Sequence, residues 1–187
     1  VYPPSIDFTI AFLACLKAGV VAVPVFPPNP ARRDTLHMFT KITESSGAKF
    51  ALTNVEYNHF KKLAGAKDAL TRFKKRQNDT IKWPDTLEWI TTDNNNKIGS
   101  SRKKGNNDNT KKLPSSPKAS DLAFLQYTSG STSEPKGVMI THGNLAHNLT
   151  IITRELNAKD DTIVVSWLPQ YHDMGLIGSY LGLLYCR

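Results

Sequence analysis

The sequence predicts an α/β fold in which layered parallel or mixed sheets are flanked by helices. Short β-branched runs such as 20–25 alternate with stretches in which apolar residues recur every three or four positions. Gly19 and Gly47 each follow such a stretch directly, at the position where a glycine commonly ends a helix. Because strands that alternate with helices usually pair in parallel, we expect parallel pairing to dominate.

The first half of the chain is expected to begin with a helix over 5–16, with Ser5 as its N-cap. The run 20–25 is typical of a strand buried on both faces, and a rigid proline turn follows it. The elements expected next are a helix over 33–45, a strand over 49–53, a basic helix over 58–76 and a strand over 87–91. The basic helix should bury a stripe formed by Leu63, Leu70 and Phe73.

The second half is expected to contain two strands joined by a polar loop, then a helix, a strand and a short helix. The predicted ranges are 121–127, 138–141, 143–156, 162–168 and a helix from about residue 174. Asp173 stands where it could cap this last helix or orient the neighbouring His172.

The net charge of +8 is unevenly distributed. Residues 61–82 are net +6 and residues 93–118 net +5, so the remainder is net −3. The segment 92–118 is rich in Asn, Lys, Ser and Gly and has almost no large apolar residue, so we expect a disordered surface insertion. A basic arm that binds nucleic acid is the alternative, but the segment lacks the interleaved aromatic residues of a single-strand binder.

The length of 187 residues corresponds to one domain or slightly more. We expect residues 1–187 to be part of a larger domain, truncated at both ends, because the chain starts without Met and stops inside an apolar stretch. The two cysteines, Cys15 and Cys186, indicate no disulfide framework or metal cluster, which fits a reducing, cytoplasmic location. No apolar run reaches transmembrane length.

The most informative segment is the loop between the strands at 121–127 and 138–141. It reads Thr128-Ser-Gly-Ser-Thr-Ser-Glu-Pro-Lys136-Gly-Val138. Small residues let the backbone approach a ligand, and consecutive N–H groups form an anion-binding concavity. The hydroxyls add donors and Lys136 adds a mobile charge. This composition predicts a loop that wraps a polyphosphate, with an unliganded hairpin connection as the alternative.

The order of the residues indicates which phosphate loop this is. The loop of nucleoside triphosphatases requires Gly-x-x-x-x-Gly-Lys-Ser/Thr, and counting from Gly130 two defining positions hold Pro135 and Gly137 instead. The segment resembles the signature of the adenylate-forming, AMP-binding ligases, Tyr-Thr-Ser-Gly-Ser/Thr-Thr-Gly-x-Pro-Lys-Gly-Val. The departure is Ser133, where the family usually has glycine; serine is costly there only if φ is positive.

Two further segments resemble one branch of that superfamily, the fatty acyl-AMP ligases. Residues 167–176, Trp-Leu-Pro-Gln-Tyr-His-Asp-Met-Gly-Leu, look like that branch, whereas acyl-CoA synthetases more often have Pro-Leu-Phe/Tyr-His. Tyr-Pro-Pro at 2–4 and Gly-Val-Val-Ala-Val-Pro-Val-Phe-Pro-Pro at 19–28 resemble it as well. The resemblance covers essentially the whole chain except 92–118.

The resemblance implies a fatty acid ligase of the AMP-forming type. A fatty acid carboxylate would attack the α-phosphorus of ATP to give acyl-adenylate and pyrophosphate, and the acyl group would then pass to an acyl carrier protein thiol. Lys136 and His172 are the implied catalytic residues, with His172 near the reacting carboxylate. The implied phosphate contacts are Thr128, Ser129, Gly130, Ser131, Thr132, Lys136 and Gly137.

His142 and Asn144 are expected to support the loop. ATP and Mg²⁺ are the implied cofactors, with the Mg²⁺ ligand outside this chain; we expect no metal ligand within it and no activity from it alone.

Three alternatives stay open. A long-chain acyl-CoA synthetase or an assembly-line adenylation domain would use the same loop. A non-catalytic module that senses lipids or nucleotides would retain the fold without the reaction. A basic nucleic-acid-binding module would bind with an affinity that falls steeply with salt.

Overall fold

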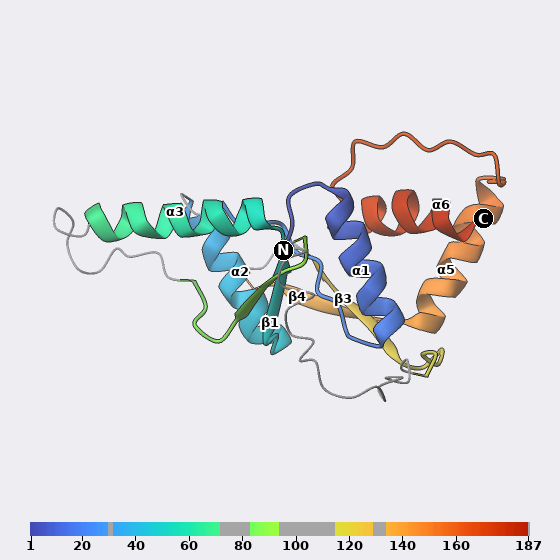
Figure 1. Cartoon of the computed structure of the whole chain (residues 1–187). Helices are drawn as coiled ribbons and strands as arrows, with labels where there is room; N and C mark the ends of the chain where they lie inside the picture. Colours follow the sequence, from blue (N-terminus) through green and yellow to red (C-terminus); the bar gives the residue numbers. More distant parts are fainter. Residues whose placement is uncertain (30–31, 72–82, 94–114, 129–133, 187) are drawn as a thin grey trace, which may run out of the picture. The chain divides into compact units, whose positions relative to one another are not determined.

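The computed structural model describes residues 1–29, 32–71, 83–93, 115–128 and 134–186 (Figure 1). The chain forms two compact units, residues 1–11 with 26–113 and residues 12–25 with 114–187, and each is described by itself. Helix α1 (Ile6–Ala18) contributes residues to both units. The fold is mixed α/β, as predicted, with one parallel and one antiparallel two-stranded sheet.

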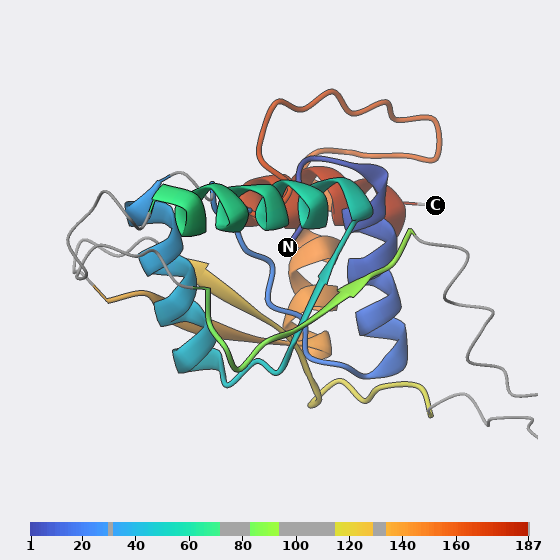
Figure 2. The same cartoon turned by 60° about the vertical axis from the view of Figure 1, so that its left-hand side comes forward.

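The first unit is built on the parallel pair of strands β1 (Phe50–Thr53) and β2 (Glu88–Thr91), seen in Figure 2. Helix α2 (Arg33–Ser46) precedes β1 and ends at Gly47, which has φ +65°, so the predicted cap is confirmed. Helix α3 (Val55–Thr71) begins just after β1. The Asp93 carboxylate accepts the Val55 N–H at 2.9 and 3.0 Å, which joins the start of α3 to the segment that follows β2.

An aromatic cluster of Phe39, Tyr57, Trp83 and Trp89 joins α2, α3 and β2. The Trp83 and Trp89 rings are perpendicular, with centroids 5.3 Å apart, and Phe39 lies 5.8 Å from Trp83. Tyr57 stacks on Trp89 at 6.3 Å and donates its hydroxyl to the Pro28 carbonyl at 2.6 Å. Edge-to-face and stacked pairs add to the free energy gained by burying the rings.

Lys61 of α3 lies over this aromatic cluster. Its ammonium nitrogen is 3.7 Å from the Trp89 centroid and 5.3 Å from the Trp83 centroid, within the range of cation–π attraction. Burial, and to a smaller extent the neighbouring charge of Lys62, lowers the pKa of Lys61 to about 8. The rings therefore attract the cation without fully replacing the water that it loses.

The predicted buried stripe of α3 is wrong at Leu63, whose side chain is 64% exposed. The helix instead contacts the aromatic cluster through the buried Tyr57, six residues before Leu63, and the half-buried Lys61, two residues before it. The helix also starts earlier than the predicted range 58–76, whereas residues 72–76 lie outside the described residues. The side chains of Leu70 and Phe73 lie outside the described residues.

The second unit is built on the antiparallel hairpin of strands β3 (Leu122–Thr128) and β4 (Lys136–Thr141). Helix α5 (His142–Glu155) follows β4 directly, and the π-helical segment η2 (Met174–Leu181) continues into α6 (Gly182–Tyr185). These last helices pack against α5, where the hydroxyls of Thr150 and Tyr185 are 2.7 Å apart (Figure 1). The core includes Phe12 of α1, whose ring meets Phe124 edge-on at 5.4 Å.

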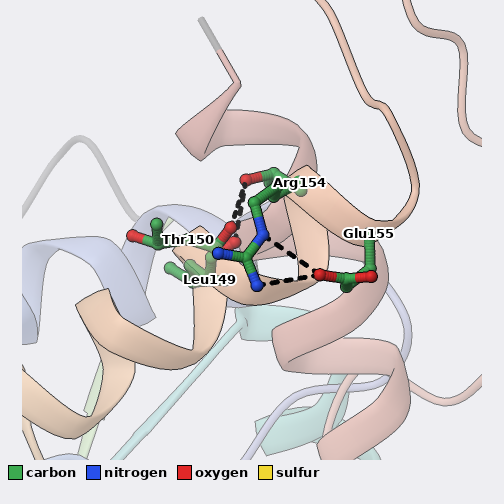
Figure 3. Close-up of polar contacts among 5 residues, drawn as sticks. Leu149, Thr150, Arg154 and Glu155 are labelled. Atoms are coloured by element: carbon green, nitrogen blue, oxygen red, sulfur yellow. Dashed lines mark hydrogen bonds and ion pairs between the residues drawn. The ribbon is translucent and has the colours of Figure 1, made fainter.

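The C-terminal end of α5 is closed by hydrogen bonds within the helix (Figure 3). The Thr153 hydroxyl donates to the carbonyls of Leu149 at 2.9 Å and Thr150 at 3.2 Å. Arg154 and Glu155 form an ion pair at 2.8 Å, but both side chains are about two-thirds exposed, so the pair contributes little to stability. Asn157, with φ +49°, then turns the chain away, since asparagine tolerates this backbone conformation.

Two predicted strands do not form. Residues 20–25 make a single parallel bridge, between Ala22 and Phe124, and Val20 is 55% exposed rather than buried. Pro24 has no N–H to donate to a ladder, which weakens such a run as a strand. Residues 162–168 are not a strand either, and Ile163, Val165 and Trp167 are about 90% exposed because no described strand lies beside them to accept their pairing.

The remaining elements agree closely with the expectations. Helix α1 begins just after Ser5 and ends at Gly19, which has φ +66°. The described helices include none that is long and apolar enough to cross a bilayer. Of the predicted insertion 92–118, residues 94–114 lie outside the described residues, so its disorder stays a prediction. Thr92 belongs to the first unit, with its hydroxyl 2.8 Å from that of Tyr2.

The Lys61 site predicts a pH-dependent stability. Its pKa in the folded protein, about 8, lies below the usual lysine pKa of 10.5, so between these pH values the unfolded chain binds more protons. The free energy of unfolding should therefore rise with pH across this window. Lys61→Met should remove that rise, whereas Lys62→Met, at an exposed neighbour, should keep most of it, because the charge of Lys62 is the smaller cause of the lowered pKa of Lys61. Urea unfolding at about pH 8 and about pH 10, within the window between the two pKa values, measures the difference, and an equal rise in both variants would contradict it.

Candidate functional site

The predicted phosphate loop connects β3 to β4 as a hairpin. Thr128, the last residue of β3, is the ladder partner of Lys136, the first residue of β4. The pairing holds the two ends of the loop side by side, and both end residues are exposed. A hydroxyl and an ammonium group therefore stand on exposed residues at the base of the loop, an arrangement suited to binding an anion.

The hairpin is closed by packing between Tyr127 and Gly137, which face each other in the ladder. A Cβ on Gly137 would lie 2.9 Å from Cζ of Tyr127, so the ring occupies the space that a side chain would need. Glycine at 137 thus allows the tyrosine ring to lie across β4. This gives Gly137 a structural reason, next to its predicted role as a phosphate contact.

A capping box fixes the junction between β4 and α5. The Thr141 hydroxyl accepts the Asn144 N–H at 3.1 Å, and the Asn144 side-chain oxygen accepts the Thr141 N–H at 3.2 Å. His142 donates its N–H to the Asp121 carbonyl at 3.0 Å, which anchors the helix to the start of β3. Asn144 and His142 thus support the hairpin through backbone and capping contacts.

His172 lies in a tight turn, Pro169 to Asp173, that we call the His172 turn. Its N–H donates to the Pro169 carbonyl at 3.0 Å, and its own carbonyl accepts the Leu176 N–H at 2.7 Å. The imidazole Nδ1 is 2.6 Å from the Asp173 carboxylate, and both side chains are more than half exposed. Asp173 also accepts the Met174 N–H at 2.7 Å, so it orients His172 and caps η2, the two roles expected of it.

The His172 turn is held at two points. Gly175 approaches the Pro169 carbonyl so closely that a Cβ would lie 2.2 Å from its oxygen, a contact that no other residue could make without moving the backbone. The second point is Gln126 of β3, whose side-chain Nε2 donates to the Tyr171 carbonyl at 3.0 Å. The strand that leads into the phosphate loop therefore also contacts the residue before His172.

The predicted site residues divide into two groups. Thr128, Lys136, Gly137 and His172 are described, and the hairpin brings the first three together. Ser129, Gly130, Ser131 and Thr132 lie outside the described residues, so their contacts stay predictions. The sequence reasoning missed Gln126 and Gly175 as supports of the His172 turn. A glutamine inside a buried apolar strand was the signal available for Gln126.

A family comparison decides which proteins this arrangement belongs to. The family model described as AMP-binding enzyme matches residues 1–187. The chain belongs to this family. As a member of the AMP-binding enzymes it is 35% identical to the medium-chain fatty acid–acyl carrier protein ligase TtuA of Teredinibacter turnerae, over 98% of this chain and 30% of that protein. It is 36% identical to the corresponding ligase JamA of Moorena producens, over 98% of this chain and 28% of that protein.

Solved structures agree with this family and with the fold. The fatty acid AMP ligase of Legionella pneumophila superposes with a TM-score of 0.72 at 36% identity, over 98% of this chain and 27% of that one. The fatty acyl-adenylate ligase of L. pneumophila in complex with acyl adenylate and pyrophosphate gives 0.70 at the same identity and coverage. This AMP-binding enzyme chain is thus homologous to AMP-forming fatty acid ligases, and it spans less than a third of the length of these relatives.

Replacing Gly175 tests the close approach in the His172 turn. Gly175→Ala should lower the free energy of unfolding by about 1–3 kcal/mol, because the new methyl group forces the backbone apart. Gly178→Ala is the matched control, since a Cβ there meets no atom within 4 Å. It should be neutral or gain up to about 1 kcal/mol, as alanine is the better helix former. Denaturant unfolding of the full-length protein measures both, and equal effects would contradict the close contact.

Proposed function

We propose that the protein carrying this chain activates a fatty acid with ATP. The carboxylate attacks the α-phosphorus, which gives acyl-adenylate and pyrophosphate, and the acyl group then passes to the thiol of an acyl carrier protein. The observation that supports this most strongly is the hairpin that sets Thr128 opposite Lys136, in a chain 36% identical to a ligase solved with acyl adenylate and pyrophosphate.

The roles follow from the charges in this reaction. Negative charge grows on the departing pyrophosphate, so preorganised donors are needed where its oxygens lie. Lys136 would bind the β- and γ-phosphates with its ammonium group, and Thr128 would add a hydroxyl donor. The undescribed loop residues Ser129, Gly130, Ser131 and Thr132 would complete the contacts, with Gly137 at the base of the loop. No general base is required, because a carboxylic acid is ionised at neutral pH.

His172 would lie at the mouth of the acyl pocket, close to the reacting carboxylate. Its contact with Asp173 fixes the orientation of the imidazole, and its exposure leaves the other ring nitrogen free to meet a ligand. The described residues include no cluster of three His, Cys, Asp or Glu side chains suited to a metal ion, and a Mg²⁺ ligand outside this chain stays part of the proposal. Mg²⁺, when bound, would neutralise charge on the phosphates.

The acceptor thiol has one specific alternative. TtuA and JamA are named as acyl carrier protein ligases, whereas a Mycobacterium leprae relative, 33% identical over 94% of this chain, is named as a putative fatty acid–CoA ligase. We favour the carrier protein because the Trp167–Leu176 segment has the fatty acyl-AMP ligase pattern.

The function is tested by ATP–pyrophosphate exchange with the full-length protein, a series of fatty acids and no coenzyme A. Exchange that requires the acid establishes adenylate formation. Transfer of the labelled acyl group to a carrier protein or to coenzyme A then identifies the acceptor. A folded protein that shows no exchange with any acid would instead support the non-catalytic module.

Lys136→Ala tests the central role assigned to the loop. Loss of one preorganised donor to a developing charge should slow acid-dependent exchange about 100-fold or more. Affinity for the fatty acid should stay nearly unchanged, since Lys136 is assigned to ATP. Lys159→Ala is the control, because that lysine is also exposed but lies after α5. Equal losses in exchange rate and acid affinity would refute the assignment.

A further inference from the structure

Gln126 is the one polar residue among the three buried residues of β3. It lies two residues after Phe124, so both side chains are on the same face of β3, and they are 7% and 0% exposed. An amide at such a position loses its water and must find partners within the protein. Gln126 finds one across a separation of 45 residues, the Tyr171 carbonyl.

The orientation of the Gln126 amide follows from this partner. A carbonyl only accepts hydrogen bonds, so the amide nitrogen, and not the amide oxygen, must face Tyr171. The other end of the amide, Oε1, is buried and has no hydrogen-bond partner among the described residues. A buried amide with one free acceptor stabilises a fold poorly, because the unpaired oxygen has lost its hydration.

The Tyr171 carbonyl lies directly before His172 in the His172 turn. It belongs to the peptide group that contributes the His172 N–H, and that N–H donates to Pro169 at 3.0 Å. Gln126 therefore holds one side of this peptide group while Pro169 holds the other. Two residues beyond Gln126, the same strand ends at Thr128, at the base of the phosphate loop.

We propose that Gln126 is a positioning residue that fixes the His172 turn against the strand leading into the phosphate loop. This inference rests on the proposed function for its catalytic readout. Gln126 touches neither phosphate nor acid; it acts through His172, by keeping the imidazole at a constant place relative to the hairpin. The unpaired Oε1 of Gln126 costs stability, and we attribute the presence of a glutamine at this buried position to the positioning role.

Gln126→Met is the sharpest test, because methionine has a similar length and no hydrogen-bonding amide. The kcat/KM for the fatty acid in ATP–pyrophosphate exchange should fall about tenfold or more, because small misplacements of active-site groups cause losses of this size. The KM for ATP should stay unchanged. In a His172→Ala background the same substitution should have almost no further effect, because the group it positions is gone. Equal losses in both backgrounds, or no loss in either, would overturn the proposal.

A readout that needs no activity separates this proposal from the proposed function. Hydrogen exchange at the amides of His172 and Leu176 should accelerate in Gln126→Met, since the turn loses one of its two supports. Asn148→Met, at an exposed asparagine on α5, is the matched control and should change neither the amide hydrogen exchange of the turn nor the activity. If the wild-type protein shows no ATP–pyrophosphate exchange that depends on the fatty acid, the proposed function fails. Amide hydrogen exchange then decides the role of Gln126 alone, and unchanged amide hydrogen exchange in Gln126→Met refutes that role.

A rescue variant adds a pH signature that loss of packing would not produce. Gln126→Glu can donate to the Tyr171 carbonyl only while its carboxyl group is protonated, and burial favours that form. Its activity relative to wild type should therefore be highest at acidic pH and fall as the pH rises. A ratio that is constant with pH would contradict the hydrogen bond as the source of the effect. Gln126→Leu, which is shorter and cannot overfill the site, replaces Gln126→Met if the latter does not fold.

Discussion

The antiparallel ladder between β3 and β4 is the constraint on which the second unit depends. It fixes the ends of the phosphate loop by pairing Thr128 with Lys136, and it delivers Thr141 to the N-terminus of α5. Strand β3 also forms the β-bridge with Ala22, and its residue Phe124 packs against Phe12. The ladder thus links the predicted phosphate loop, a helix start and a hydrophobic core, so neither the helix start nor the core can move far without disturbing the other.

Around this rigid hairpin the candidate site is made of exposed groups. Lys136, Thr128 and His172 all reach solvent, and their positions come from buried or paired neighbours: the strand ladder, Asp173, Gly175 and Gln126. This division is common in enzymes, where supporting residues restrict the rotamers and the reacting side chains stay accessible. It also means that the residues most sensitive to substitution extend beyond those that would touch a ligand.

The sequence predicted the features that are decided locally. The helix ends at Gly19 and Gly47 and the hairpin around the loop follow from residues within a few positions of each other. The errors concern partners that are distant in the chain. Leu63 is exposed because Tyr57 and Lys61 face the aromatic cluster, and residues 162–168 lack a described neighbour to pair with. The hydrogen bond between Gln126 and Tyr171, which are 45 residues apart, could not be predicted from the periodicity of apolar residues either.

The ring of Tyr127 over Gly137 has a consequence for observing this molecule. Protons close to an aromatic ring experience its ring current, so the chemical shifts of the Gly137 α-protons should depend on the position of the Tyr127 ring. Any event that separates β3 from β4, or turns the tyrosine ring, would return them toward their usual shift. The glycine that permits the close packing is therefore also a built-in spectroscopic reporter of whether the base of the loop is open or closed.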